Sequence, residues 1–305
     1  MKRAVSISIG ASTRDKTVEI ELMGETIRLE RIGTDGDMEK AADLYRELDG
    51  QVDAFGVGGA VLGLMLEDRW YTLNSVQSLI RYIHHTPVVD GTGLKMTLER
   101  KAAAVVDEQL GNVLVNRNAL LISGVDRYGL SRSFMDAGYH CVIGDLMFTI
   151  GLPIPIRSDR ALKRIANALI PIVGRLPFEW MYPTGEKQEK RTPKFTKYFA
   201  QAGVIAGDCH YITHYMPDDM QGKIIVTNTT TPADRELLRS CGVRHLVTTT
   251  PLFDGRSFGT NMMEAAIIAA LGRKGPVDYA DSVEYMALME EVVDQLQMVP
   301  VVQEL

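Results

Sequence analysis

The hydrophobic residues of the first hundred positions follow two periods, and each period predicts a different kind of element. Alternation of apolar and polar side chains predicts a strand at Ala4–Ile9 and a hairpin built from Thr17–Leu22 and Thr26–Arg31. Helical spacing and short buried runs predict further elements at Met38–Leu48, Val52–Val57, Ser75–His84, Pro87–Val89 and Leu98–Leu110. Together they predict an N-terminal α/β domain, with Ser6 and Ser8 on a solvated face of its first strand.

From residue 119 onward, the pattern changes to short apolar runs with little alternation, which are typical of parallel strands covered on both faces. These runs lie at Ala119–Ser123, His140–Gly144, Val204–Gly207, Lys223–Thr227 and His245–Thr249. The segments between them have helical spacing and lie at Ser131–Ala137, Ser158–Val173, Lys194–Ala202 and Pro232–Ser240. Alternating strands and helices of this kind predict a doubly wound, Rossmann-like parallel sheet.

Two apolar helical segments end the chain, Thr260–Leu271 and Ser282–Leu296. The expected fold class is therefore α/β with two lobes. We predict an N-terminal α/β substrate domain at 1–115, a Rossmann-like dinucleotide-binding domain at 116–258, and C-terminal helices at 259–305 that pack back on the N-terminal domain.

Composition and charge exclude several classes of protein. A hydrophobic fraction of 46%, a charged fraction of 24% and a dispersed net charge of −6 are ordinary for a globular protein and lack the basic stripe of a nucleic-acid binder. The three cysteines are too few and too scattered for a disulfide framework, and no apolar run is long enough for a membrane span. We expect a cytoplasmic protein without nucleic-acid or membrane partners, with a homodimer left open.

A glycine-bounded turn follows the first strand of the second series. Gly124 ends that strand, Gly129 opens the next helix, and Asp145 stands at the tip of the following strand, about 20 residues on. This spacing matches a dinucleotide-binding turn, in which the acid takes the ribose hydroxyls and disfavours a 2′-phosphate. The middle glycine of GxGxxG is absent, and Asp126 would bring a carboxylate near a pyrophosphate, a charge that Arg127 could offset. A plain βα turn without a ligand remains the alternative.

The stretch AQAGVIAGDCHYITHYMPDDMQGKIIVTNTTT resembles the region of many NAD(P)-dependent dehydrogenases in which strand tips face the nicotinamide half of the cofactor. The resemblance implies that Asp208, Cys209, His210, Asn228 and Thr229 line the cofactor cleft. Taken by itself, Cys209 is either a nucleophile beside its neighbouring histidine or a buried, inert thiol.

Histidines in the same stretch have the spacing of a metal site. His210 and His214 stand four residues apart, but no complete set of metal ligands is visible, and we predict no metal. The basic and aromatic stretch 176–193, which contains Trp180, is either a surface loop or lid or a plug between the lobes.

Over nearly its whole length, the chain is similar to bacterial proteins called quinate 5-dehydrogenase. The stretches that carry the similarity are VVDGTGLKMTLER, GDLMFTIGLPIPIRS, YPTGEKQEKRTPKF, TNTTTPADRELL and DGRSFGTNMMEAA. The resemblance implies a substrate lobe, a Rossmann lobe and a lysine–aspartate pair between them. It makes Lys95 and Asp90, on the loop DGTGLK, the candidate catalytic residues, with His210 as the next candidate; a plain βα turn is the alternative for this loop.

The function that these features predict is NAD(P)-dependent oxidation or reduction of a small hydroxy or oxo compound, with NAD favoured. A quinate-like or shikimate-like cyclic hydroxy acid is the substrate class that the resemblance implies. The alternative is a non-redox protein of the same architecture, a sensor or transferase that binds a nucleotide or metabolite, and Asp126 favours this alternative.

Overall fold

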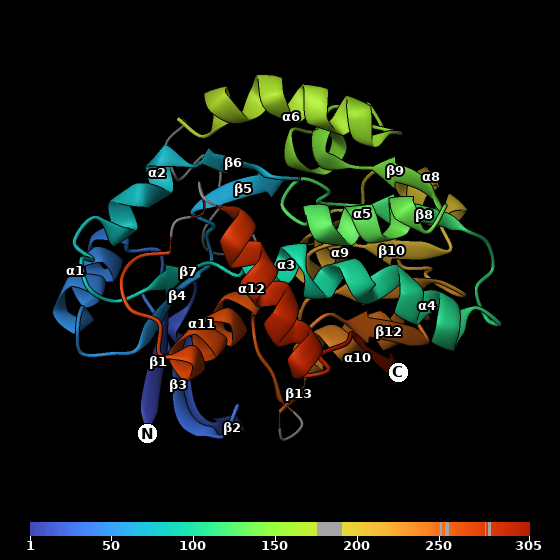
Figure 1. Cartoon of the computed structure of the whole chain (residues 1–305). Coiled ribbons are helices and arrows are strands. Elements are labelled where there is room, and N and C mark those ends of the chain that lie inside the picture. The colour runs from blue at the N-terminus through green and yellow to red at the C-terminus, as the bar shows by residue number, and fades with distance from the viewer. Residues whose placement is uncertain (176–190, 251, 254–255, 278, 280–281) are drawn as a thin grey trace. The chain divides into compact units, whose positions relative to one another are not determined.

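The computed structural model describes the whole chain except residues 176–190, 251, 254–255, 278 and 280–281 (Figure 1). The chain divides into two compact units. Unit 1 takes in the described parts of 1–94, 170–185 and 258–296, and unit 2 takes in those of 95–169, 186–257 and 297–305. Each unit has a sheet with parallel strands and helices around it, so the chain is an α/β protein.

The sheet of unit 1 has five strands in the order β2-β3-β1-β4-β7. In that order the strands are Lys16–Leu22, Glu25–Gly33, Lys2–Ser8, Ala54–Gly58 and Val88–Val89. β1, β3, β4 and β7 run parallel, and β2 is the antiparallel edge strand of the predicted hairpin. Met23 and Gly24 make the hairpin turn with φ angles of 55° and 76°, a left-handed conformation that glycine adopts without strain.

Helices and one small hairpin are the other elements of unit 1. They are the 3₁₀ turn η1 (Ser12–Arg14), α1 (Met38–Leu48), hairpin β5 (Gly63–Leu66) with β6 (Arg69–Thr72), α2 (Asn74–Gln77), η2 (Ser78–Ile80), α11 (Thr260–Leu271) and α12 (Ser282–Gln295). α11 packs against β1 and β4, as Figure 1 also shows, and α1 contacts β1 as well. Because β1 lies in the middle of a covered sheet, the predicted solvated face is wrong: Ser6 and Ser8 are buried. Their hydroxyl groups accept hydrogen bonds, from Asn261 Nδ2 at 2.7 Å and from the Gly10 N–H at 3.2 Å.

Unit 2 contains a sheet of six strands in the order β15-β12-β11-β10-β8-β9. These strands are Val301–Glu304, His245–Thr248, Ile224–Thr227, Val204–Ala206, Asn118–Leu121 and His140–Ile143. All neighbours from β12 to β9 are parallel, and β15 joins the far edge antiparallel to β12. The five parallel strands are those that the short apolar runs predict.

Helices of unit 2 precede the first strand of this sheet or connect its strands. They are η3 (Leu98–Lys101), α4 (Ala102–Leu110), α5 (Tyr128–Asp136), the π-helical turn η4 (Asp145–Thr149), α8 (Thr196–Gln201), α9 (Cys209–Tyr215) and α10 (Pro232–Ser240). A small hairpin, β13 (Leu252–Phe253) with β14 (Arg256–Ser257), follows β12. A core cluster joins the sheet to these helices through Leu120, Phe148, Phe199, Ile205 and Ile225. Burial of these apolar side chains stabilises the packing of the helices on the sheet.

The chain passes between the units within α3 (Thr92–Met96) and within α6 (Asp159–Val173). The division therefore puts 95–115 into unit 2, although the sequence analysis places them in the N-terminal domain. It also separates the last residues, 297–305, from α11 and α12, because β15 pairs with β12 in unit 2. Among the described residues, no helix has the length and apolar character that crossing a membrane requires.

Candidate functional site

In the sheet of unit 2, the chain leaves β8 toward one edge of the sheet and later continues from the other side of β8 toward the opposite edge. From β8 the chain goes by way of α5 to β9 on one side, and after β9 it returns to β10 on the other side of β8. In open α/β sheets, ligands bind outside the carboxyl ends of the strands at such a switch point. The predicted residues Asp126 and Arg127 follow β8, and Asp208 follows β10, so three of them lie at this point.

The glycine turn after β8 is closed by the acid that follows β9. The Asp145 carboxylate accepts hydrogen bonds from the backbone N–H groups of Gly124 and Val125, both at 2.9 Å. Burial raises the pKa of Asp145 to about 6, although these two donors lower it. Asp145 therefore stands where the sequence predicts it, but it already occupies two N–H groups of the turn that would otherwise face a phosphate.

Gly129 lies in the first turn of α5, and its lack of a side chain serves packing. A Cβ at this position would lie 1.9 Å from the backbone oxygen of Lys95 and 3.0 Å from the Met96 Cα. The glycine therefore allows α5 to approach the end of α3 closely. The glycine spacing predicts that Gly129 belongs to a dinucleotide-binding turn, whereas its close neighbours in the structure are backbone atoms of Lys95 and Met96.

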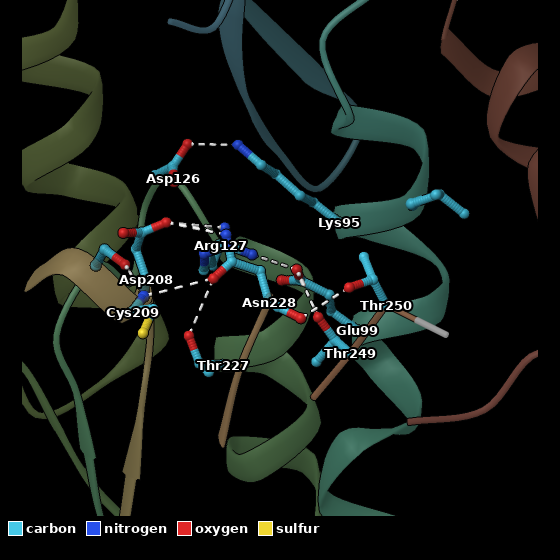
Figure 2. A network of polar contacts seen from close by, with 12 residues as sticks. Lys95, Glu99, Asp126, Arg127, Asp208, Cys209, Thr227, Asn228, Thr249 and Thr250 are labelled. Atoms are coloured by element: carbon cyan, nitrogen blue, oxygen red, sulfur yellow. Dashed lines mark hydrogen bonds and ion pairs between the residues drawn. The ribbon is translucent and has the colours of Figure 1, made fainter. Parts of the chain in front are cut away.

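Lys95 forms an ion pair, and its partner is not the expected one. Its Nζ lies 2.7 Å from Asp126 Oδ1, and the lysine side chain is only 7% exposed (Figure 2). Asp90, the partner that the family resemblance implies, lies in unit 1 and is buried there. Its carboxylate accepts hydrogen bonds from the N–H groups of Leu62 at 2.7 Å and Thr92 at 3.0 Å. A lysine–aspartate pair thus exists, formed by Lys95 with Asp126, while Asp90 holds two backbone segments together.

Arg127 lies between two carboxylates in the interior of the site. Its Nη1 pairs with Glu99 Oε1, and its Nη2 lies 3.3 Å from Asp208 Oδ2, as Figure 2 shows. Burial disfavours the charged guanidinium, but Glu99 and Asp208 together raise the pKa of Arg127. Burial also raises the pKa of Glu99, against the pull of Arg127. Sequence reasoning missed Glu99, because nothing in the stretch LERKAAA separates a buried carboxylate from one on a solvated helix face.

Asp208 connects the ends of β10 and β11. Its Oδ1 accepts the N–H of His210 at 3.0 Å and so caps α9, and its Oδ2 accepts Asn228 Nδ2 at 3.1 Å. Burial would raise the pKa of Asp208, but Arg127 and His210 lower it below its usual range. The Asn228 Oδ1 in turn accepts the Thr227 hydroxyl at 3.0 Å. Asp208 and Asn228 therefore belong to one network with Arg127.

The other predicted residues around α9 and β11 contribute less to this network. Cys209 is buried, whereas His210 is exposed at the start of α9. Thr229 is partly exposed just beyond β11. Among the described residues, no group of three or more acidic, histidine or cysteine side chains could hold a metal ion. The aromatic stretch at 176–193 lies mostly outside the described residues, which resume at Arg191.

The charged side chains of the site carry more acid than base. Lys95 and Arg127 pair with three carboxylates, which belong to Asp126, Glu99 and Asp208. A fourth carboxylate, that of Asp145, holds the turn after β8. Such a site can exchange protons through the Lys95–Asp126 pair and can orient a polar ligand through Arg127. Its charge disfavours a ligand that places several phosphates on the carboxylates.

Among the solved structures that match the chain, two are similar to it at low identity. The crystal structure of an NAD-dependent malic enzyme from Thermotoga maritima is 12% identical over 95% of this chain and 83% of that chain, with a TM-score of 0.37. A crystal structure from Mycobacterium smegmatis is 13% identical over 98% of both chains, with a TM-score of 0.31. Neither TM-score reaches the level at which two chains share a fold. No curated protein matches the sequence closely enough to count as a relative.

Two family models together match almost the whole chain. The first, a domain of unknown function named DUF8753, matches residues 3–90. The second, a domain of unknown function named DUF8754, matches residues 93–305, which is more than half of the chain. The junction between the two models lies beside the first boundary between the units, at Leu94. By the extent of the second match, the chain belongs to the DUF8754 family.

Proposed function

We propose that unit 2 binds a nicotinamide dinucleotide at the carboxyl edge of its sheet and that the protein is an NAD(P)-dependent oxidoreductase. The observation that carries this proposal is the polar network of Lys95, Asp126, Arg127 and Asp208 at the β8–β10 switch point. Side chains of this kind gathered at that position are the usual mark of a ligand site in an open α/β sheet.

The strand order supports a doubly wound fold in unit 2. With right-handed connections, the step from β8 to β9 and the steps from β10 to β12 run in opposite directions, so their helices cover opposite faces. This order corresponds to the flavodoxin-like variant of doubly wound folds, which binds its ligand at the same switch point. The two-lobed arrangement with a substrate domain is part of the same proposal.

One feature of the Arg127 side chain supports the proposal of a dinucleotide ligand. Arg127 Nε is buried and has no hydrogen-bond partner among the described residues. A buried donor without a partner is uncommon in folded proteins and is often completed by a ligand or water. An oxygen atom of a bound nucleotide would complete it.

Lys95 is the group that we assign to proton transfer. When an alcohol is oxidised to a carbonyl, the carbon loses a hydride and the hydroxyl oxygen loses a proton. A nicotinamide ring supplies the hydride acceptor when it is bound. In the reverse reaction, the Lys95 ammonium, which Asp126 orients at 2.7 Å, would give a proton to the carbonyl oxygen. This leaves the neutral amine that takes the hydroxyl proton in the oxidation.

Asp145 is the residue that we assign to the choice between NAD and NADP. It follows β9, the strand tip at which an acid disfavours the 2′-phosphate of NADP. With a pKa of about 6, Asp145 is mostly ionised at neutral pH. We therefore expect NAD to bind more tightly than NADP.

A second candidate is a non-redox protein that binds a neutral or cationic metabolite. It is favoured by the hydrogen bonds that Asp145 makes to the Gly124 and Val125 N–H groups, which leave fewer donors for a pyrophosphate. The excess of carboxylates around Arg127 points the same way.

Titration of the protein with NAD⁺, NADH, NADP⁺ and NADPH tests the proposal. We expect saturable binding of the NAD forms, weaker binding of the NADP forms, and affinity for the NAD forms that is about tenfold lower or more in Arg127→Met. Arg239→Met provides the matched control, because Arg239 is an exposed arginine on α10. Absence of binding to all four compounds would rule out the redox proposal, and mass spectrometry of co-purified ligands would then identify the metabolite. Cyclic hydroxy acids come first in a substrate screen, because the resemblance to quinate dehydrogenases suggests them.

A further inference from the structure

Glu99 is a completely buried carboxylate with 0% of its surface exposed. It lies in η3, one turn after Lys95, and it comes from a different part of the chain than the strand ends of the site. An ionised carboxylate in the interior is costly unless it is paired and hydrogen-bonded. The contacts of Glu99 therefore indicate what it does.

The two carboxylate oxygens of Glu99 differ in their hydrogen bonding. Oε1 pairs with Arg127 Nη1 and accepts the Thr249 hydroxyl at 3.2 Å. Oε2 is buried and has no hydrogen-bond partner among the described residues. Glu99 is therefore anchored at one oxygen, and that oxygen fixes one end of the Arg127 guanidinium.

The guanidinium of Arg127 is held at both of its terminal nitrogens. Nη1 pairs with Glu99 and Nη2 with Asp208, while the Nε–H remains without a partner in the described part of the chain. Because the guanidinium is planar and rigid, fixing its two terminal nitrogens also fixes the direction of the Nε–H. The two carboxylates thus determine where the remaining donor points.

We infer that Glu99 is a positioning residue that acts through Arg127, holding the guanidinium so that its Nε–H can meet an oxygen of the bound nucleotide. The inference rests on the proposed function, because it names the donor that the nucleotide would use. Stability alone accounts poorly for this pair. Apolar residues of similar volume often replace a buried ion pair without loss of stability, and each partner here retains an unused polar atom.

The first test needs no ligand. Arginine side-chain ¹⁵N NMR follows the Arg127 Nε–H signal, which is assigned by its loss in Arg127→Lys. In the wild type we expect a distinct signal with slow exchange, and in Glu99→Gln we expect a shifted signal whose exchange with water is about tenfold faster or more. Thr249→Val removes the other donor to Glu99 Oε1 and should have a smaller effect. An unchanged signal in Glu99→Gln would overturn the positioning role.

The second test is a double-mutant cycle on NADH affinity with Glu99→Gln, Arg127→Met and both together. We expect each single substitution to weaken binding about tenfold or more, and the double variant to bind no worse than Arg127→Met alone. Losses that add in the double variant would show that Glu99 does not act through Arg127.

The two tests separate this inference from the proposed function. If the wild type binds no nicotinamide dinucleotide, the redox proposal fails and the Nε–H signal alone decides whether Glu99 positions Arg127. Should Glu99→Gln fail to fold, Glu99→Met combined with Arg127→Met removes both charges of the Glu99–Arg127 pair. This double variant should fold, because Asp208 keeps its hydrogen bonds from the His210 N–H and from Asn228. NADH binding by that double variant at wild-type affinity would overturn the inference.

Discussion

Five charged side chains of the candidate site form ion pairs with one another. Lys95 pairs with Asp126, and Arg127 pairs with Glu99 and Asp208. In the low-polarity interior each of these pairs limits how far its members can move, and breaking one leaves an uncompensated charge. A ligand that enters this network must therefore replace a contact or use an atom that has none.

The Lys95–Asp126 pair leads to a prediction about the reaction. Lys95→Met should lower turnover by about 10²–10⁴-fold and leave NAD affinity nearly unchanged, because a proton-transfer group acts on the substrate hydroxyl. Steady-state kinetics with an active substrate, together with NAD titration, measure the two effects separately. Lys197→Met is the control, since Lys197 is an exposed lysine of the same unit. Full activity in Lys95→Met would leave His210 as the next candidate.

At the scale of elements, the close approach of α5 to α3 fixes the backbone from which Lys95 extends. The approach is possible only because position 129 has no side chain, since a Cβ there would lie 1.9 Å from the Lys95 oxygen. A glycine inside a helix is otherwise unfavourable by about 1 kcal/mol relative to alanine. Gly129 therefore lowers the intrinsic stability of the helix α5 but permits the close packing of α5 against α3.

Gly129→Ala should therefore destabilise the protein, in contrast to most glycine-to-alanine changes inside helices. The clash is with backbone, so α5 or α3 has to shift, and we expect a loss of about 1–3 kcal/mol or more in the free energy of unfolding. Urea unfolding at equilibrium measures it. Asp136→Ala, at an exposed position of the same helix, should change stability by less than about 1 kcal/mol. Equal stability of Gly129→Ala and wild type would contradict the packing role.

Elements with strong local signals could be predicted from the sequence, and those that depend on distant partners could not. α1 has the predicted bounds, and α10 begins at Pro232 after the Thr231 cap, as expected. Strand β15 was missed because four residues at the chain end become a strand only by pairing with β12. Hairpin β5–β6 was missed because its turn has a left-handed glutamate, Glu67, at a φ of 56°, in place of a glycine signal.

For the candidate site, the sequence predicts which residues follow the strand ends but not which side chains pair with them. Residues that follow strand tips, such as Asp126, Asp145 and Asp208, could be identified because parallel strands end at one edge. Their partners could not. Lys95 pairs with Asp126, and Arg127 pairs with Glu99. Tertiary packing brings these residues together, and their spacing in the sequence does not indicate it.

At the scale of the whole molecule, buried acids link folding to pH. Burial raises the pKa of Glu264 to about 7, and the nearby Asp90 carboxylate adds to this effect. Glu264 lies on α11 in unit 1, where its carboxylate accepts hydrogen bonds from the Tyr279 and Tyr285 hydroxyls at 3.0 and 2.7 Å and from the Leu94 N–H at 2.9 Å. These three donors lower the pKa but do not offset burial.

A carboxyl group whose pKa is raised by folding binds its proton more tightly in the folded chain than in the unfolded one. Between the ordinary value of 4.5 and about 7, the folded protein therefore holds more protons, and the free energy of unfolding rises as pH falls. The contribution of Glu264 is fully present below the unfolded value and is lost as pH rises through about 7. Asp145, with a pKa of about 6, adds a change of the same sign at lower pH.

Glu264→Gln should remove the part of this pH dependence centred near neutrality. The glutamine oxygen can accept the Leu94 N–H, and its NH₂ can donate to the tyrosine hydroxyls, so the neutral side chain imitates protonated Glu264. We expect wild type to lose stability on the order of 2–3 kcal/mol between about pH 5 and pH 8 through this group, and the variant to lose correspondingly less. Urea unfolding across that range measures both slopes, and Glu291→Gln, at an exposed position of α12, is the matched control. Identical slopes for wild type and Glu264→Gln would show that Glu264 does not take up a proton in the folded protein at these pH values.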